Sequence, residues 1–111
     1  MSIFDWIKKE KEPEEPRELE DGTIRQRIRF HGRVQGVGFR YTATAYANDL
    51  RLTGWVRNED DGTVLMEVQG REEAIEKLIQ LMESGRYIEI TRVEKQNIAV
   101  DYHESRFGSR W

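Results

Sequence analysis

A stretch of nine residues, GRVQGVGFR at positions 32–40, combines glycines and an arginine in the pattern of an anion site. A strand pattern runs into this stretch and a helix pattern leaves it, so Arg40 is expected in the first turn of the helix. Successive backbone N–H groups in such a turn converge on one anion, and a helix N-terminus adds partial positive charge. The guanidinium of Arg40 supplies a fixed charge whose forked shape matches phosphate oxygens. The segment therefore predicts a cradle for a single phosphoryl group.

The same pattern has a second interpretation, because a glycine-rich turn between a strand and a helix is often only a tight connection. On the pattern alone, the structural and the functional interpretations of residues 34–39 are equally supported. The local charge favours an anion, since five arginines and no acidic residue lie between Thr23 and Arg40. A positive region of this kind attracts a small anionic ligand.

The composition excludes several classes of site. The 111 residues contain no cysteine, which removes disulfides, thiolate metal ligands and thiol nucleophiles. No apolar run is long enough to span a membrane, and the N-terminus lacks the long apolar stretch and the cleavage site of a secretory signal. The length suits one domain, and a cytoplasmic location is expected.

The net charge of −3 is unevenly distributed along the chain. Residues 1–22 carry four Lys or Arg against eight Asp or Glu, and the segment 8–22 holds both prolines without any apolar period. This composition predicts a charged, disordered tail over residues 1–22 and a folded domain over residues 23–111. The apolar residues of the segment 3–7 would share one helix face, which fits either a surface anchor or a loosely packed end.

Hydrophobic periodicity predicts the elements that hold the glycine-rich stretch. In chain order they are a strand from Thr23, a helix over 39–51, strands over 53–58 and 64–70, a helix over 72–83, a strand around 88–93 and a short strand that includes Phe107. Strand–helix–strand–strand–helix–strand is the order of an α+β, ferredoxin-like sandwich, βαββαβ. Both helices are expected to cover one face of an antiparallel sheet. The other face would carry the solvated side chains of the first strand, Arg25, Arg27, Arg29 and His31.

Three motifs taken together resemble the acylphosphatase family. GRVQGVGFR at 32–40 is followed by GWVRN at 54–58 and DGTV at 61–64. The resemblance covers residues 24–93, and the arginine and the asparagine of the first two motifs stand at the family's separation, eighteen positions apart. It implies hydrolysis of the carboxyl–phosphate bond of small acyl phosphates to carboxylate and inorganic phosphate. It also implies that no metal and no cofactor takes part.

The resemblance further implies roles for individual residues. The family's phosphate-binding arginine falls on Arg40 and its water-positioning asparagine falls on Asn58. The phosphate-binding segment falls on Val34, Gln35, Gly36, Val37, Gly38, Phe39 and Arg40. Backbone amides would hold the phosphoryl oxygens while Arg40 stabilises their charge and Asn58 holds the attacking water. The acidic residues 59–61 are interpreted as a hairpin turn rather than as a metal site.

Two other functions compete with this interpretation. The first is a non-catalytic or channelled carbamoyl-phosphate domain, as in the larger hydrogenase-maturation proteins that begin with a similar module. This chain has none of their zinc-finger cysteines or further domains, so a free-standing enzyme is expected. A nucleic-acid binder on this architecture would need outward aromatic residues on its central strands and a strongly basic domain. Residues 23–111 hold fourteen Lys or Arg against thirteen Asp or Glu. We expect a monomer that binds a small acyl phosphate, with phosphate or sulfate as competitors, and neither nucleic acid nor a membrane span.

Overall fold

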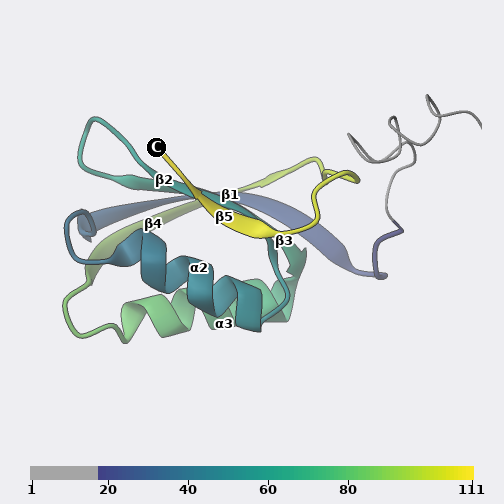
Figure 1. Cartoon of the computed structure of the whole chain (residues 1–111), viewed down its shortest axis with the longest axis horizontal. Helices are drawn as coiled ribbons and strands as arrows, with labels where there is room; N and C mark the ends of the chain where they lie inside the picture. The colour runs from purple at the N-terminus through teal and green to yellow at the C-terminus, as the bar shows by residue number, and fades with distance from the viewer. Residues whose placement is uncertain (1–17) are drawn as a thin grey trace, which may run out of the picture.

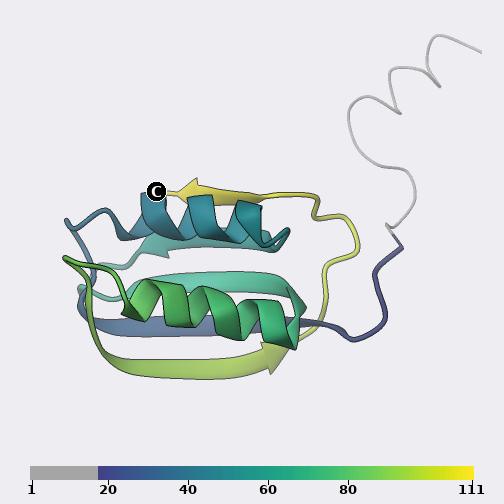
Figure 2. The ribbon, with the colours of Figure 1, turned by 90° about the horizontal axis from the view of Figure 1, so that it is seen from below.

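The computed structural model of the chain describes residues 18–111. Most of the predicted tail over residues 1–22, with the apolar segment 3–7, lies outside the described residues. Two helices lie together on one face of a five-stranded sheet, as Figures 1 and 2 show from two directions. The elements are β1 (Thr23–Arg33), α2 (Phe39–Asp49), β2 (Thr53–Asn58), β3 (Val64–Arg71), α3 (Glu72–Glu83), β4 (Glu89–Ile98) and β5 (Phe107–Arg110). The predicted ferredoxin-like order is therefore confirmed. Neither of these helices is long and apolar enough to cross a lipid bilayer.

The sheet has the strand order β4-β1-β3-β2-β5, and it is mixed rather than wholly antiparallel. The pairs β4–β1, β1–β3 and β3–β2 are antiparallel, as predicted, whereas β5 pairs in parallel with β2 from Gly54↔Phe107 to Arg57↔Arg110. The difference arises because residues 99–106 carry the chain from β4 at one edge to the opposite edge, where β5 runs in the direction of β2. Figure 2 shows β5 along this edge, next to α2. This placement brings the end of β5 to the start of α2.

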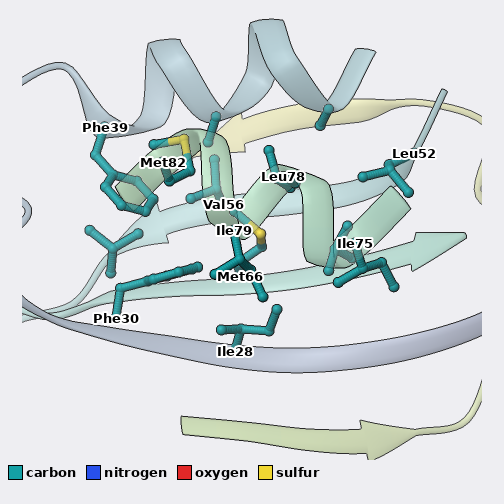
Figure 3. Packing of buried hydrophobic residues seen from close by; sticks show 14 of the residues in the cluster. Ile28, Phe30, Phe39, Leu52, Val56, Met66, Ile75, Leu78, Ile79 and Met82 are labelled. Carbon is teal, nitrogen blue, oxygen red and sulfur yellow. The ribbon is translucent and has the colours of Figure 1, made fainter. Parts of the chain in front are cut away.

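The core lies between the helices and the sheet, and it fixes the elements on both sides of the glycine-rich loop (Figure 3). Helix α3 buries one stripe at the i, i+3, i+4 and i+7 positions, which are Ile75, Leu78, Ile79 and Met82. Strand β1 contributes Ile28 and Phe30, and α2 contributes Phe39, all of them buried. Each large apolar side chain buried in this way stabilises the fold by roughly 1.5–3 kcal/mol. The loop is thus held between two well-packed elements.

The face of the sheet away from the helices carries a network of ion pairs, which we call the open face. Arg25 is only 4% exposed, so the prediction that it is solvated is wrong. Its guanidinium donates to Glu104 at 2.7 Å and to Glu67 at 3.1 Å. Arg27, whose side chain is 51% exposed, also pairs with Glu67, at 2.7 Å. Acidic residues from β3 and from the segment before β5 therefore neutralise arginines of β1.

Candidate active site

The predicted phosphate-binding loop, residues 34–39, is anchored at both ends by its own apolar side chains. Val34 and Phe39 are buried, and the Phe39 ring packs on Phe30 with the ring centroids 4.9 Å apart. Val37 also packs against the core. With these side chains enclosed by the protein, the main chain of the loop is the part left to contact a ligand.

Two glycines of this loop adopt a backbone conformation that other residues rarely take. Gly36 has φ 73° and Gly38 has φ 81°, both in the left-handed region. A Cβ added at either position would meet no atom within 4 Å, so both glycines border open space. Gly38 is also the N-cap of α2, and the described residues provide neither a side-chain cap nor an acidic first-turn residue there. The positive end of α2 is therefore left uncapped and without a neighbouring acidic charge in its first turn.

The side chain of Gln35 ties the loop to the turn between β2 and β3. Its Nε2 donates to the carbonyl oxygens of Glu59, at 2.7 Å, and of Thr63, at 2.8 Å. The role predicted for Gln35 involved only its main chain, and this side-chain contact was not predicted. Nothing local in the sequence signals it, because the two partners lie 24 and 28 residues further along. The contact fixes the loop against the turn that follows Asn58.

Arg40 lies in the first turn of α2, as predicted, and is held by neutral groups. Its Nη1 donates to the carbonyl oxygen of Arg110 at 3.0 Å, and its Cζ lies 4.4 Å from the centroid of the Trp111 ring. Among residues 18–111, no carboxylate forms an ion pair with Arg40 within 4.0 Å. The guanidinium is thus oriented without being neutralised. Arg110 and Trp111 have no signal in the sequence, because the parallel pairing of β5 alone brings them here.

Asn58 is the last residue of β2, and it lines a hollow of about 500 Å³. The other walls of this hollow are Arg29, Arg57, Glu59, Asp60, Asp61 and Trp111. Since the Trp111 ring also stacks on Arg40, one aromatic side chain connects the surroundings of the two predicted catalytic residues. Figures 1 and 2 both place the loop before α2, the β2–β3 turn and the end of β5 at the same end of the molecule. The structure thus places the two segments that hold the predicted site residues at one end of the molecule, together with the end of β5.

The acidic residues 59–61 are engaged in and around the turn between β2 and β3. Glu59 pairs with Arg57 at 3.0 Å and with Arg29 at 3.8 Å. Hydrogen bonds from the side chain and then the backbone of Thr63 hold the pKa of Asp61 below its ordinary value. Within residues 18–111, no three His, Asp or Glu side chains come together as a metal site. Arg29 and Arg57 thus offset part of the negative charge around Asn58.

Comparison with known proteins assigns the family. The family model described as acylphosphatase matches residues 26–108, which includes the whole of the glycine-rich loop, Arg40 and Asn58. The chain belongs to the acylphosphatase family. An acylphosphatase from Geobacillus kaustophilus (strain HTA426) is 43% identical over 90 residues, which cover 77% of this chain and 96% of the relative.

Solved structures agree with this family. The crystal structure of an acylphosphatase from Bacillus subtilis has a TM-score of 0.74 and 32% identity, and the match covers 79% of this chain and 99% of that chain. The crystal structure of HypF from T. kodakarensis has a TM-score of 0.70 and 31% identity over 79% of this chain, but over only 12% of that chain. The fold of this chain is thus similar to that of a whole acylphosphatase chain and to that of one part of a longer protein.

Proposed function

We propose that the loop 34–39, Arg40 and Asn58 together carry the hydrolysis of acyl phosphates that membership of the acylphosphatase family assigns to this chain. The observation that carries this proposal is the set of neutral partners that surround the Arg40 guanidinium. Its guanidinium is held by a carbonyl oxygen and an aromatic ring, and it stands beside an uncapped helix N-terminus. A charge that is fixed in position but not neutralised is what a phosphoryl group requires.

The reaction follows from these groups with no titrating side chain. Main-chain N–H groups of the loop and the Arg40 guanidinium hold the phosphoryl oxygens and stabilise the charge that develops on them. The Asn58 amide holds a water, whose oxygen forms the new bond to phosphorus. The bond from phosphorus to the acyl oxygen breaks, and its electron pair leaves with the carboxylate. The carboxylate is a weak base, so no general acid is needed, and the phosphate oxygens take up the proton of the water.

The same site supports three narrower proposals. Inorganic phosphate and sulfate compete with the substrate, because each is a tetrahedral anion of the size that the loop and Arg40 would hold. The enzyme is proposed to act as a monomer, since the loop, Arg40 and Asn58 suffice for the proposed chemistry. The chemistry proceeds without a metal ion, because Arg40 and the loop supply the positive charge. The cytoplasmic location stays a prediction from the sequence.

Release of inorganic phosphate from acetyl phosphate, measured in the presence of EDTA, tests the activity and its metal independence together. We expect turnover that EDTA does not change and that added sulfate inhibits competitively. Loss of turnover on chelation, restored by a divalent cation, would contradict the proposed mechanism.

Substitution of Asn58 tests whether this residue positions the attacking water while the loop and Arg40 bind the anion. Asn58→Ala should lower kcat by on the order of 10²-fold, because the attacking water loses its position. The inhibition constant for phosphate should change by less than about twofold, since the loop and Arg40 still bind the anion. Asn48→Ala, at an exposed position on α2, is the matched control and should leave both quantities unchanged. Equal losses in kcat and in phosphate affinity would place Asn58 in anion binding instead.

A further inference from the structure

A second hollow, of about 390 Å³, lies directly against Arg40. It is formed by the first turns of α2 and by residues at and after the end of β5, namely Arg40, Tyr41, Thr44, Ala45, Ser109 and Trp111. The Thr44 hydroxyl already donates to the carbonyl oxygen of Arg40 at 2.7 Å, so its methyl group remains for a ligand. A concave site lined mainly by methyl and aromatic groups suits an apolar ligand.

Two exposed aromatic side chains flank this hollow. Tyr41 is 83% exposed and Trp111 is fully exposed, so neither contributes to the core. One face of the Trp111 ring stacks on the Arg40 guanidinium. Large apolar surfaces that remain in water favour a ligand that covers them, and aromatic rings pack well against other planar groups. A planar apolar group next to Arg40 would cover both rings.

The position of the hollow relative to the bond that breaks indicates which part of the substrate this planar apolar group is. In phosphoryl transfer the attacking oxygen and the leaving oxygen lie in line, on opposite sides of phosphorus. Asn58, which holds the attacking water in the proposed mechanism, lines the other hollow and does not line this one. With the water at Asn58 and the phosphoryl group at Arg40, the proposed mechanism directs the leaving carboxylate away from Asn58, and this hollow adjoins Arg40 but not Asn58.

We propose that the hollow beside Arg40 binds the acyl part of the substrate, and that Tyr41 and Trp111 favour aromatic or branched apolar acyl groups over acetyl. This inference rests on the proposed function, because it takes the phosphoryl group to be bound at Arg40. Acyl phosphates differ in intrinsic reactivity, so the informative quantity is the ratio of kcat/KM for benzoyl phosphate to kcat/KM for acetyl phosphate, compared between variants.

The sharpest test fills the hollow from within α2. Ala45 is exposed, so Ala45→Phe should fold normally while its ring occupies the space of the acyl group. We expect the benzoyl-to-acetyl ratio to fall about tenfold, the size of effect that one apolar contact has on specificity. Tyr41→Ala, which removes one wall, should lower the ratio by about threefold or more. Gln80→Phe, at an exposed position on α3, is the matched control and should keep the wild-type ratio.

The outcomes separate this inference from the proposed function. A ratio that stays at the wild-type value in both Ala45→Phe and Tyr41→Ala would overturn the acyl site. If Arg40→Gln has meanwhile lost turnover of both substrates, the proposed function stands and only the acyl site fails. Near-normal turnover of both substrates by Arg40→Gln would overturn the proposed function itself.

Discussion

Arg25 on the open face and Arg40 beside the loop are both held in place, but by partners of opposite kinds. Arg25 is buried and donates to the carboxylates of Glu67 and Glu104. Arg40 donates to a main-chain carbonyl and stacks on Trp111. A buried charge requires a counter-charge to be tolerated in the fold, whereas a carboxylate beside Arg40 would compete with the substrate for it. The kind of partner therefore distinguishes an arginine that supports the fold from one that is available to a ligand.

A single residue of β5 links these two regions. The carbonyl oxygen of Arg110 accepts the hydrogen bond from Arg40. The Arg110 guanidinium lies over the Trp55 ring on the open face, 4.7 Å from its centroid, and Arg57 lies 5.0 Å from the same centroid. Trp55 is buried although no helix covers that face. The cationic side chains that cover Trp55 therefore also hold in place the strand that orients Arg40.

The largest expected effect is on turnover, at Arg40. Arg40→Gln removes the only guanidinium that we place on the phosphoryl oxygens, so kcat/KM for acetyl phosphate should fall by 10²-fold or more, on the order of the loss of one stabilising donor. The free energy of unfolding, measured in urea, should change by less than about 1 kcal/mol, because the side chain lies near the surface. If Arg40→Gln instead loses stability and keeps its turnover, Arg40 supports the fold, as Arg25 does, and not the reaction.

The next effect is on stability, at Arg25. Arg25→Met should lower the free energy of unfolding by about 2 kcal/mol, because Glu104 and Glu67 would lose a buried partner. Turnover should stay within twofold of wild type, since Arg25 lies outside the proposed site. Arg27→Gln is the control at the neighbouring, half-exposed position, and a change below about 0.5 kcal/mol is expected there. Equal destabilisation by the two variants would show that burial does not distinguish these arginines.

The smallest expected effect is on the stability of the fold at acid pH, through the carboxyl group of Glu67. Burial alone would raise the pKa of Glu67, but hydrogen bonds from Arg27 and Arg25 outweigh burial and hold its pKa below the ordinary value of 4.5. The unfolded chain therefore binds this proton at a higher pH than the folded chain does. The stability that Glu67 contributes is present above pH 4.5 and is lost as the pH falls through the lower folded pKa.

Urea unfolding between pH 3 and pH 6 checks this prediction. The free energy of unfolding of the wild type should decline below pH 4.5. Glu67→Gln should start from a lower stability and should decline less steeply, because it lacks the titrating carboxyl. Curves of equal slope would assign the acid sensitivity to other carboxyls, such as Glu94, whose pKa is lowered by a hydrogen bond from His31.

Much of the fold could be predicted because it depends on local patterns. The period-two run from Thr23 defined β1, and the apolar stripe from Ile75 to Met82 defined α3 with its observed bounds. The same locality placed Arg40 in the first turn of α2, directly after the loop. The direction of β5 was not predictable in this way, because Phe107 and Gly108 carry no information about which strand they pair with.

The side-chain contacts of the site and of the open face also divide into those that local sequence predicts and those that it does not. Gln35 and Asn58 were predicted as site residues because each lies in a short motif that is continuous in the chain, GRVQGVGFR at 32–40 and GWVRN at 54–58. That Gln35 bonds to the carbonyl of Thr63, or that Arg25 is buried, depends on partners at least 28 residues away. Such contacts exist only once the strands have paired in one register.

By itself, the sequence determined the order of the elements, the glycine-rich turn between β1 and α2 and the presence of an arginine at a helix start. These features follow from backbone sterics and hydrophobic period, which act between near neighbours in the chain. Only the tertiary structure decided which arginines are neutralised, which carbonyl orients Arg40 and where an apolar hollow opens beside it. The arginines are neutralised across the β1–β3 pair, and Arg40 and the hollow depend on the parallel pairing of β5 with β2, which joins residues about fifty positions apart. Such pairings arise through packing rather than through local preference.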